Sequence, residues 1–179
     1  MIILNLPERI ETSRLVLQRL KYEDAEEIFH IYASKVEATI FVAWPTHQSI
    51  VDTRSFLNYA IAAWDGDTDF SYSIRLKDSN RFIGSFGVLH DDGKVQFGYF
   101  FAPAEWNKGY ATETCQKMMS ILKAKTSLHR IWTLVDVENV ASIRVLEKSG
   151  LVEEARVAKW FRFINQGNDP KDCIFFKLP

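Results

Sequence analysis

The spacing of apolar side chains along the chain predicts strands and helices in its first half. Apolar and polar residues alternate over 14–19, which predicts a first strand. Apolar stripes at helical spacing predict two helices, one over 25–32 and a longer one over 49–64. The longer helix has Ser49 as a candidate N-cap, with Asp52 three residues further on, as is typical of a helix start.

A meander of three strands is expected next. The strands are predicted over 70–76, 81–90 and 94–101. Between the last two lies the pair Asp92-Gly93, a strong signal for a β-hairpin turn. The earlier stretch 41–47 is aromatic, contains a proline and has no clean period, so we expect it to be a loop.

The remaining third of the chain alternates between helices and strands. Helices are expected over 109–125 and 139–149, on either side of a strand at 130–136. A strand resumes at Leu151, and two closing strands are expected at 157–163 and 172–178. The predicted order is β-α-α-β-β-β-α-β-α-β-β. No repeat or interdomain linker interrupts it, so we expect one domain of the α+β or α/β class over residues 1–179.

Composition narrows the possible functions. Of 179 residues, 47% are hydrophobic and 25% charged, which is typical of a globular protein with a substantial core. The net charge of −1 provides no broad basic field, which argues against nucleic-acid binding. No apolar stretch has the length of a membrane span or signal peptide, so a cytoplasmic protein is the default expectation. Two distant cysteines, Cys115 and Cys173, indicate neither a zinc site nor a disulfide framework.

A candidate phosphate site lies at the start of the 109–125 helix. The first turn of a helix has unpaired N–H groups and a partial positive charge. Gly109 allows a phosphate to approach the backbone, Ala111 keeps the next turn small, and Lys108 adds charge. The combination suits a pyrophosphate. A glycine at a helix start can also be purely structural, and the missing Gly-Lys-Ser/Thr run excludes a Walker loop.

A second motif lies at the start of the 139–149 helix. Asn139 and Ser142 are three residues apart, so they share one helix face. The Asn139 amide can bond a peptide-like chain, and the Ser142 hydroxyl can protonate a leaving group. Arg144 and Lys148 add local positive charge. In the alternative interpretation, Asn139 only caps its helix, and Glu147 forms solvated ion pairs with these two cations.

These two motifs carry a resemblance to a known family. Trp106-Asn-Lys-Gly-Tyr-Ala-Thr-Glu113 and Asn139-x-x-Ser142, followed by Glu147-Lys-Ser-Gly-Leu151, resemble the two signatures of the GNAT N-acetyltransferase superfamily. The branch is that of the RimJ/RimL-like enzymes, which acetylate protein N-termini. The resemblance runs from Glu11-Thr-Ser-Arg-Leu15 to the final strand. It implies a mixed central sheet of about seven strands, flanked by about four helices.

The resemblance also implies a reaction and its residues. Acetyl-CoA would be the donor and an amine the acceptor, without a metal and without a covalent enzyme intermediate. The strand backbone at 100–102 would pair with the pantetheine arm and offer one amide as an oxyanion donor. Ser142 would be the acid for the coenzyme A thiolate, and Asn139 would contact pantetheine. The full set of expected acetyl-CoA contacts is Phe100, Phe101, Ala102, Lys108, Gly109, Tyr110, Ala111, Thr112, Asn139 and Lys148.

Three residues depart from the family pattern. Leu146 stands where many relatives carry a tyrosine acid, so protonation falls to Ser142 or to solvent. Gln96 stands where a glutamate base is common, and an amide cannot accept a proton usefully at neutral pH. Asn107 replaces the glycine that usually precedes the signature lysine. The remaining candidates for the base are His90, Asp91, Glu105 and water.

The acceptor is left open by the residues. The loop 41–47 and the early helices are where we expect acceptor specificity, with His47 as a candidate facing the cleft. A protein or peptide N-terminus is favoured over a small amine such as a polyamine, an amino sugar or an antibiotic. Because the usual tyrosine and glutamate are missing, a non-catalytic acyl-CoA-binding module is a further alternative, and an empty fold with an interaction role is another. A homodimer is compatible with the sequence, but no residue specifies one.

Overall fold

One mixed sheet organises the molecule. The computed structural model describes residues 2–167 and 169–179, and in these residues eight strands form a single sheet. In chain order the strands are β1 (Arg9–Glu11), β2 (Leu15–Arg19), β3 (Asp69–Leu76), β4 (Phe82–Asp91), β5 (Lys94–Phe101), β6 (Arg130–Asp136), β7 (Val152–Phe161) and β8 (Lys171–Lys177). Their spatial order is β1-β2-β3-β4-β5-β6-β8-β7, and every neighbouring pair is antiparallel except β5–β6.

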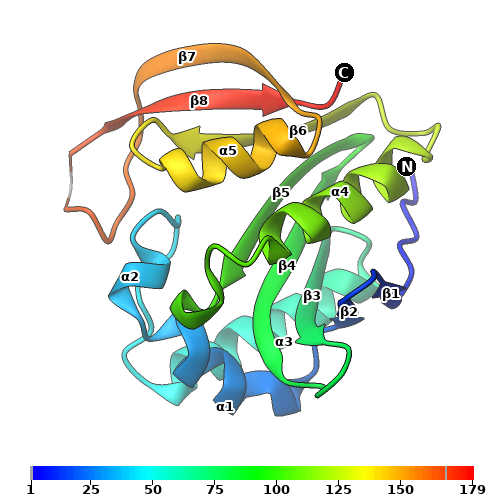
Figure 1. The fold of residues 1–179 in the computed structure, drawn as a ribbon, viewed down its shortest axis with the longest axis vertical. Helices are drawn as coiled ribbons and strands as arrows, with labels where there is room; N and C mark the ends of the chain where they lie inside the picture. Colours follow the sequence, from blue (N-terminus) through cyan, green and yellow to red (C-terminus); the bar gives the residue numbers. More distant parts are fainter. Residues whose placement is uncertain (1, 168) are drawn as a thin grey trace.

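Helices cover both faces of this sheet (Figure 1). The α-helices of the described chain are α1 (Ala25–Ile28), α2 (Val36–Thr39), α3 (Ile50–Asp65), α4 (Tyr110–Lys123) and α5 (Val140–Lys148). Short helical turns occur at Tyr22–Asp24, Phe29–Ala33 and Pro103–Glu105. We call the face under α4 and α5 the α4 face, and the opposite face the α3 face. In β5, Phe97, Tyr99 and Phe101 point to the α4 face, whereas Gln96, Gly98 and Phe100 point to the α3 face.

Most of the predicted elements are confirmed, several of them with a physical reason. The strong hairpin signal is confirmed, since Asp92 and Gly93 both have positive φ, +43° and +87°, as a tight β4–β5 turn requires. The start of α3 is also confirmed, because the N–H of Ser49 donates to the Asp52 carboxylate at 2.9 Å. The stretch 41–47 contains neither helix nor strand, as expected.

Other predictions were wrong. The sheet has an extra three-residue strand, β1, which is too short to show a period. The separate closing strand expected at 157–163 is the continuation of β7, which runs unbroken from Val152 to Phe161. Lys159, with a φ of +51°, and a register shift between Val157 and Phe161 interrupt its alternation. The first helix is also shorter than predicted, because α1 gives way to a π-helical turn at Phe29.

The parting of β5 from β6 positions the site. Eight residue pairs join β5 to β4, but only three join it to β6, and the last of these is Gln96–Trp132. Immediately beyond, the hydroxyl of Thr133 donates to the carbonyl of Phe97 at 2.7 Å in place of a backbone bond. The strand β6 then continues beside β8. From Tyr99 to Phe101, the edge of β5 that faces β6 has no strand partner in the described chain.

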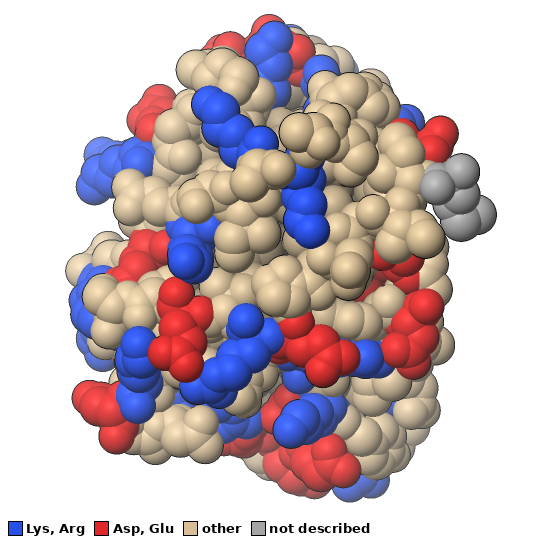
Figure 2. All heavy atoms as spheres, turned by 90° about the vertical axis from the view of Figure 1, so that its right-hand side faces the viewer, with Lys and Arg blue, Asp and Glu red and all other residues tan. Residues whose placement is uncertain are grey.

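None of the described helices combines the length and the apolar character that crossing a membrane would require. The described residues also contain no group of three or more potential metal ligands among His, Cys, Asp and Glu. On the face drawn in Figure 2, Lys and Arg side chains are interspersed with Asp and Glu rather than gathered into one broad field.

Candidate active site

The free edge of β5 offers backbone donors to the gap beside β6. The N–H of Ala102 donates to the carbonyl of Ile83 at 2.9 Å, so its amide is used by β4. Backbone groups alternate between the two edges of a strand, which turns the amide of Phe100 towards β4 as well. The N–H groups of Tyr99 and Phe101 therefore face the gap. Of the three residues expected to offer an amide, only Phe101 has its N–H on this side.

The turn before α4 has the backbone shape of an anion site. Gly109 is the N-cap of α4 with a φ of +80°, and in the described chain no side chain caps this helix start. The N–H groups of Tyr110, Ala111 and Thr112 therefore lack a carbonyl partner within the helix. Asn107 also has positive φ, +62°, a conformation that asparagine tolerates better than most residues. Asn107 can therefore replace the family glycine and still adopt the left-handed conformation of this turn.

A partly exposed hydrogen-bond cluster fixes this turn to the N-terminal segment. The carboxylate of Glu113 accepts hydrogen bonds from the hydroxyls of Thr12 at 2.6 Å and Ser13 at 3.0 Å. It also accepts from the backbone N–H of Arg14 at 2.9 Å and from its Nε at 2.7 Å. The same guanidinium donates to the carbonyl of Lys108 at 3.0 Å. Burial raises the pKa of Glu113, but these hydrogen bonds outweigh it and bring the pKa to about 2.

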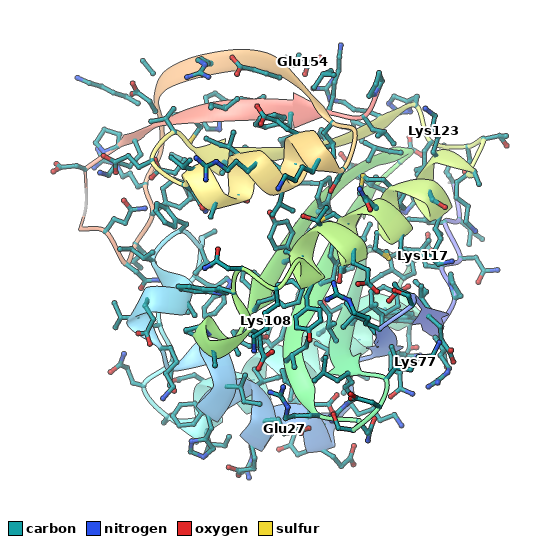
Figure 3. The ribbon with its side chains drawn as sticks, in the orientation of Figure 1. Glu27, Lys77, Lys108, Lys117, Lys123 and Glu154 are labelled. Atoms are coloured by element: carbon teal, nitrogen blue, oxygen red, sulfur yellow. The ribbon has the colours of Figure 1, made fainter. Side chains whose placement is uncertain are left out.

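Lys108 contributes less free charge than its sequence position suggested. It lies in the turn ahead of α4 (Figure 3), and its ammonium contacts the carboxylate of Glu105 at 3.0 Å. Glu105 is buried and also accepts from Arg81 at 2.7 Å. The Arg81 hydrogen bond is the main reason that the pKa of Glu105 is lowered. Between two cations, Glu105 is unsuited to accept a proton from an amine.

Asn139, Ser142 and a residue not predicted from the sequence lie together on the α4 face. The side-chain oxygen of Asn139 accepts the N–H of Ser142 at 3.2 Å, so Asn139 does cap α5. The hydroxyls of Ser142 and Tyr99 are 2.7 Å apart. Burial raises the pKa of Tyr99, which keeps its phenol protonated at neutral pH. The structure thus places a second hydroxyl beside the candidate acid, where Leu146 is buried and inert.

The sequence did contain a signal for Tyr99. Strand alternation puts its side chain on the α4 face of β5, the same face that α5 covers. What the sequence did not show is that this strand position lies against the first turn of α5. This pairing joins residues 43 positions apart, so no local pattern shows it.

Two of the base candidates lie at the far end of β5. His90 pairs with Val95, and its Nε2 accepts the N–H of Gly93 at 3.2 Å. Its Nδ1 lies 3.0 Å from the carbonyl of Asp67, so the ring is fixed in place. Asp91 forms an ion pair with Lys94 at 2.8 Å. Neither residue is near the free edge at Tyr99–Phe101.

The loop 41–47 flanks the free part of β5 on the α3 face. The ring of Trp44 packs edge-on against Phe100, with centroids 5.5 Å apart, and its centroid is 5.0 Å from that of His47. The Nδ1 of His47 lies 2.7 Å from the hydroxyl of Thr53, and burial lowers the pKa of His47. Next to Phe100 on this face, a Cβ at Gly98 would meet no atom within 4 Å. The α3 face is therefore open beside the gap.

Lys148 lies at the end of α5 with an exposed side chain, and its carbonyl accepts from the Gln116 side chain at 2.8 Å. This bond joins α5 to α4.

A splayed sheet, an uncapped helix start and a serine–tyrosine pair are together compatible with an acyl-CoA-dependent transferase. The model of the acetyltransferase (GNAT) domain matches residues 14–152, and the chain belongs to this family. It is an acetyl-CoA-dependent N-acetyltransferase.

Individual relatives agree with this assignment. The chain is 27% identical to the uncharacterized N-acetyltransferase YoaA of Bacillus subtilis (strain 168), over 94% of this chain and 95% of YoaA. Its fold is similar to RimL, the ribosomal L7/L12 alpha-N-protein acetyltransferase, in complex with coenzyme A. The TM-score is 0.85 at 16% identity, over 95% of this chain and 97% of that one. It is also similar to spermidine N-acetyltransferase from Vibrio cholerae, with a TM-score of 0.79 at 18% identity, over 93% and 95%.

The Glu113 cluster leads to a stability prediction. Glu113→Gln is expected to lower the free energy of unfolding at neutral pH by about 1 kcal/mol, because the amide loses the negative charge and one of the two acceptor oxygens. The folded-state pKa of about 2 lies below the ordinary value of 4.5, so this stabilisation is present above pH 4.5 and is lost as pH falls towards 2. Urea unfolding at several pH values measures it. Glu153→Gln, at an exposed ion pair, is the control and should change little. Equal stability of Glu113→Gln and wild type at neutral pH would contradict the assigned role of the cluster.

Proposed function

We propose that this protein transfers the acetyl group of acetyl-CoA directly to an α-amine at the N-terminus of a protein or peptide. The observation that supports the donor side best is the free edge of β5 at Tyr99–Phe101, which leads to the uncapped start of α4. In the part of the chain that the structure describes, the N–H groups at both places have no strand or capping partner. A pantetheine arm and a pyrophosphate carry the matching acceptors.

The proposed donor site follows from this arrangement. The diphosphate binds the N–H groups of residues 109–112, with added charge from Lys148 rather than from Lys108, which Glu105 partly neutralises. The pantetheine arm pairs with the free edge of β5. Because the side-chain oxygen of Asn139 is used by Ser142, its amide NH₂ is the group that contacts the arm. The thioester carbonyl accepts from the N–H of Phe101.

The chemistry requires one bond to form and one to break. The neutral amine attacks the thioester carbon from the α3 face, where Gly98 leaves space, and the carbonyl oxygen takes up negative charge opposite the Phe101 N–H. As the C–S bond breaks, the Ser142 hydroxyl gives a proton to the thiolate, and Tyr99 holds that hydroxyl in place. The proton released by the amine leaves to water, since Gln96 cannot take it.

The open α3 face supports an acceptor that is part of a longer chain. The helices α1 and α3 pack over β2, β3 and the start of β4, and beyond them Leu89 of β4 remains exposed. A peptide entering with its N-terminus first needs such an open approach. Likeness of fold to RimL is compatible with this acceptor, and likeness to the Vibrio cholerae spermidine enzyme makes a small polyamine the alternative.

The role of Ser142 is tested by removing its hydroxyl. Ser142→Ala should lower kcat about a hundredfold, while the Kd for acetyl-CoA stays close to that of wild type. Tyr99→Phe should also lower kcat, and the double variant should lose little more than Ser142→Ala alone, because the two hydroxyls act as a unit. Steady-state release of coenzyme A and calorimetry measure these quantities. Ser55→Ala, on the exposed side of α3, is the control. An unchanged kcat in Ser142→Ala would remove Ser142 from the mechanism.

The phosphate turn is tested at its glycine. Gly109→Val should weaken acetyl-CoA binding by about tenfold or more, because a β-branched residue resists positive φ and crowds the diphosphate. Gly167→Val is the matched control, since Gly167 has the same φ of +80° in a loop away from α4. Calorimetric titration with acetyl-CoA compares the two. Normal affinity in Gly109→Val would refute the assigned turn.

The acceptor side is tested at Gly98. Because its φ is not in the left-handed range and a Cβ there meets open space, Gly98→Val should fold normally. It should raise the KM for the acceptor about tenfold by narrowing the approach, and leave the Kd for acetyl-CoA unchanged. Initial rates with a panel of peptides that differ at the N-terminus measure the acceptor KM, and calorimetric titration measures the Kd for acetyl-CoA. An unchanged acceptor KM would place the acceptor elsewhere.

A further inference from the structure

A buried carboxylate on the α3 face has no cationic partner. Asp69, in β3, is 7% exposed, and its Oδ1 accepts the hydroxyl of Ser71 at 2.9 Å. The hydroxyl of Tyr59, on the α3 helix, is a second polar neighbour of this carboxylate. Within residues 2–167 and 169–179, no Lys, Arg or His forms an ion pair with Asp69. Its charge is met by two neutral hydroxyls alone.

Two other acidic side chains with similar burial are balanced by a cation, whereas Asp136, 1% exposed, accepts from the backbone N–H of Glu138 and the side-chain amide of Gln166. Asp24, also 7% exposed, pairs with Arg75 at 2.8 Å, and Glu105, 4% exposed, pairs with Arg81 at 2.7 Å. An unpaired buried charge is costly, and burial raises the pKa of Asp69. A ligand cation at Asp69 would remove that cost, so the site favours binding of positive charge.

Asp69 lies within reach of the proposed acceptor approach. The sheet register places Asp69, Leu89 and Gln96 side by side on three neighbouring strands, all facing the α3 face. The adjacent row holds Gly87 and Gly98, where a Cβ would meet at most one side-chain atom, at 3.8 Å. Leu89, between Asp69 and β5, is 47% exposed. The glycine row therefore leaves a diagonal path open from the carboxylate, past one side of Leu89, to the space over Gly98.

We propose that Asp69 binds a second positive charge of the acceptor, so that the enzyme prefers amines that carry another cation. This rests on the proposed function, since it places the reacting amine beside the free edge of β5. Two strand spacings across the sheet and one row of side chains along it separate Asp69 from Gly98, so the second cation lies on the order of 12 Å from an amine over Gly98. A lysine or arginine side chain near a peptide N-terminus can span this distance, and so can the far end of a long diamine.

Matched acceptor pairs test the proposal and separate these two sources. One pair is diaminooctane, with an amine at each end, and octylamine. The other is a peptide with lysine as its second residue and the same peptide with norleucine there. The wild type should show a lower KM for the doubly charged member of at least one pair. In Asp69→Asn, that KM should rise about tenfold, while kcat and the KM of the singly charged member stay unchanged. Asp78→Asn, in the exposed β3–β4 turn, is the control.

A second variant keeps the test independent of the folding of Asp69→Asn. The N–H of His90 donates to the carbonyl of Thr68, so Asp69 and Leu89 form a non-hydrogen-bonded pair with closely spaced side chains. Leu89→Lys should place an ammonium of the protein on Asp69 and remove the preference for doubly charged acceptors. Leu89→Gln, of similar size without charge, should keep it.

The outcomes are distinct from those of the proposed function. Two results overturn the Asp69 site. One is equal KM values of the wild type for both members of each pair, and the other is an equal rise in KM for both members in Asp69→Asn. If no amine releases coenzyme A, the proposed function fails, and calorimetric binding of diaminooctane against octylamine without acetyl-CoA then decides on Asp69 alone. Tighter binding of the diamine that Asp69→Asn abolishes supports the site, and equal binding of the two amines overturns it.

Discussion

The separation of β5 from β6 is the constraint on which the rest of the structure depends. Strands in a sheet satisfy their N–H and C=O groups against neighbours, and buried groups left without partners are costly. Here the pairing of β5 with β6 stops at Gln96–Trp132, and Thr133 supplies the last contact through its hydroxyl. The edge beyond is a strip of backbone that can pair with a ligand carrying its own donors and acceptors. A pantetheine arm, with two amides, is such a ligand.

The helix start next to this edge also presents backbone N–H groups that no carbonyl of its own helix accepts. α4 begins at a left-handed glycine with no side-chain cap in the described chain, so its first N–H groups are also left for a ligand. The turn needs an outside support to hold this shape. Arg14 and Glu113, 99 residues apart, provide it by tying the turn to the chain before β2. The N-terminal segment therefore supports the turn to which we assign donor binding.

In the proposed mechanism, the two faces of the sheet have different roles. On the α4 face, Tyr99 and Ser142 meet where the leaving thiolate would be protonated. On the α3 face, the open space at Gly98 and the unpaired Asp69 are suited to an incoming amine. Gln96, which points to the α3 face, leaves this side without a strong base at the family position. In the proposed mechanism, the reaction therefore depends on the neutral fraction of the acceptor amine and on water for proton release.

Local sequence patterns predicted what local forces determine. The β4–β5 hairpin follows from Asp92-Gly93, the start of α3 from Ser49 and Asp52, and the α4 turn from Gly109. Features that join distant segments were not predictable in this way. The contact of Tyr99 with Ser142 is one, and the neutralisation of Lys108 by buried Glu105 is another. The strand β1 was missed because three residues carry no period, and its pairing with β2 gives it its form.

The most direct measurement is a crystal structure of the protein with acetyl-CoA. The account predicts the diphosphate against the N–H groups of residues 109–112, the pantetheine arm along the free edge of β5 and the thioester oxygen within hydrogen-bonding distance of the Phe101 N–H. Acetyl-CoA bound elsewhere, or a β5 edge closed by β6 in that complex, would contradict it.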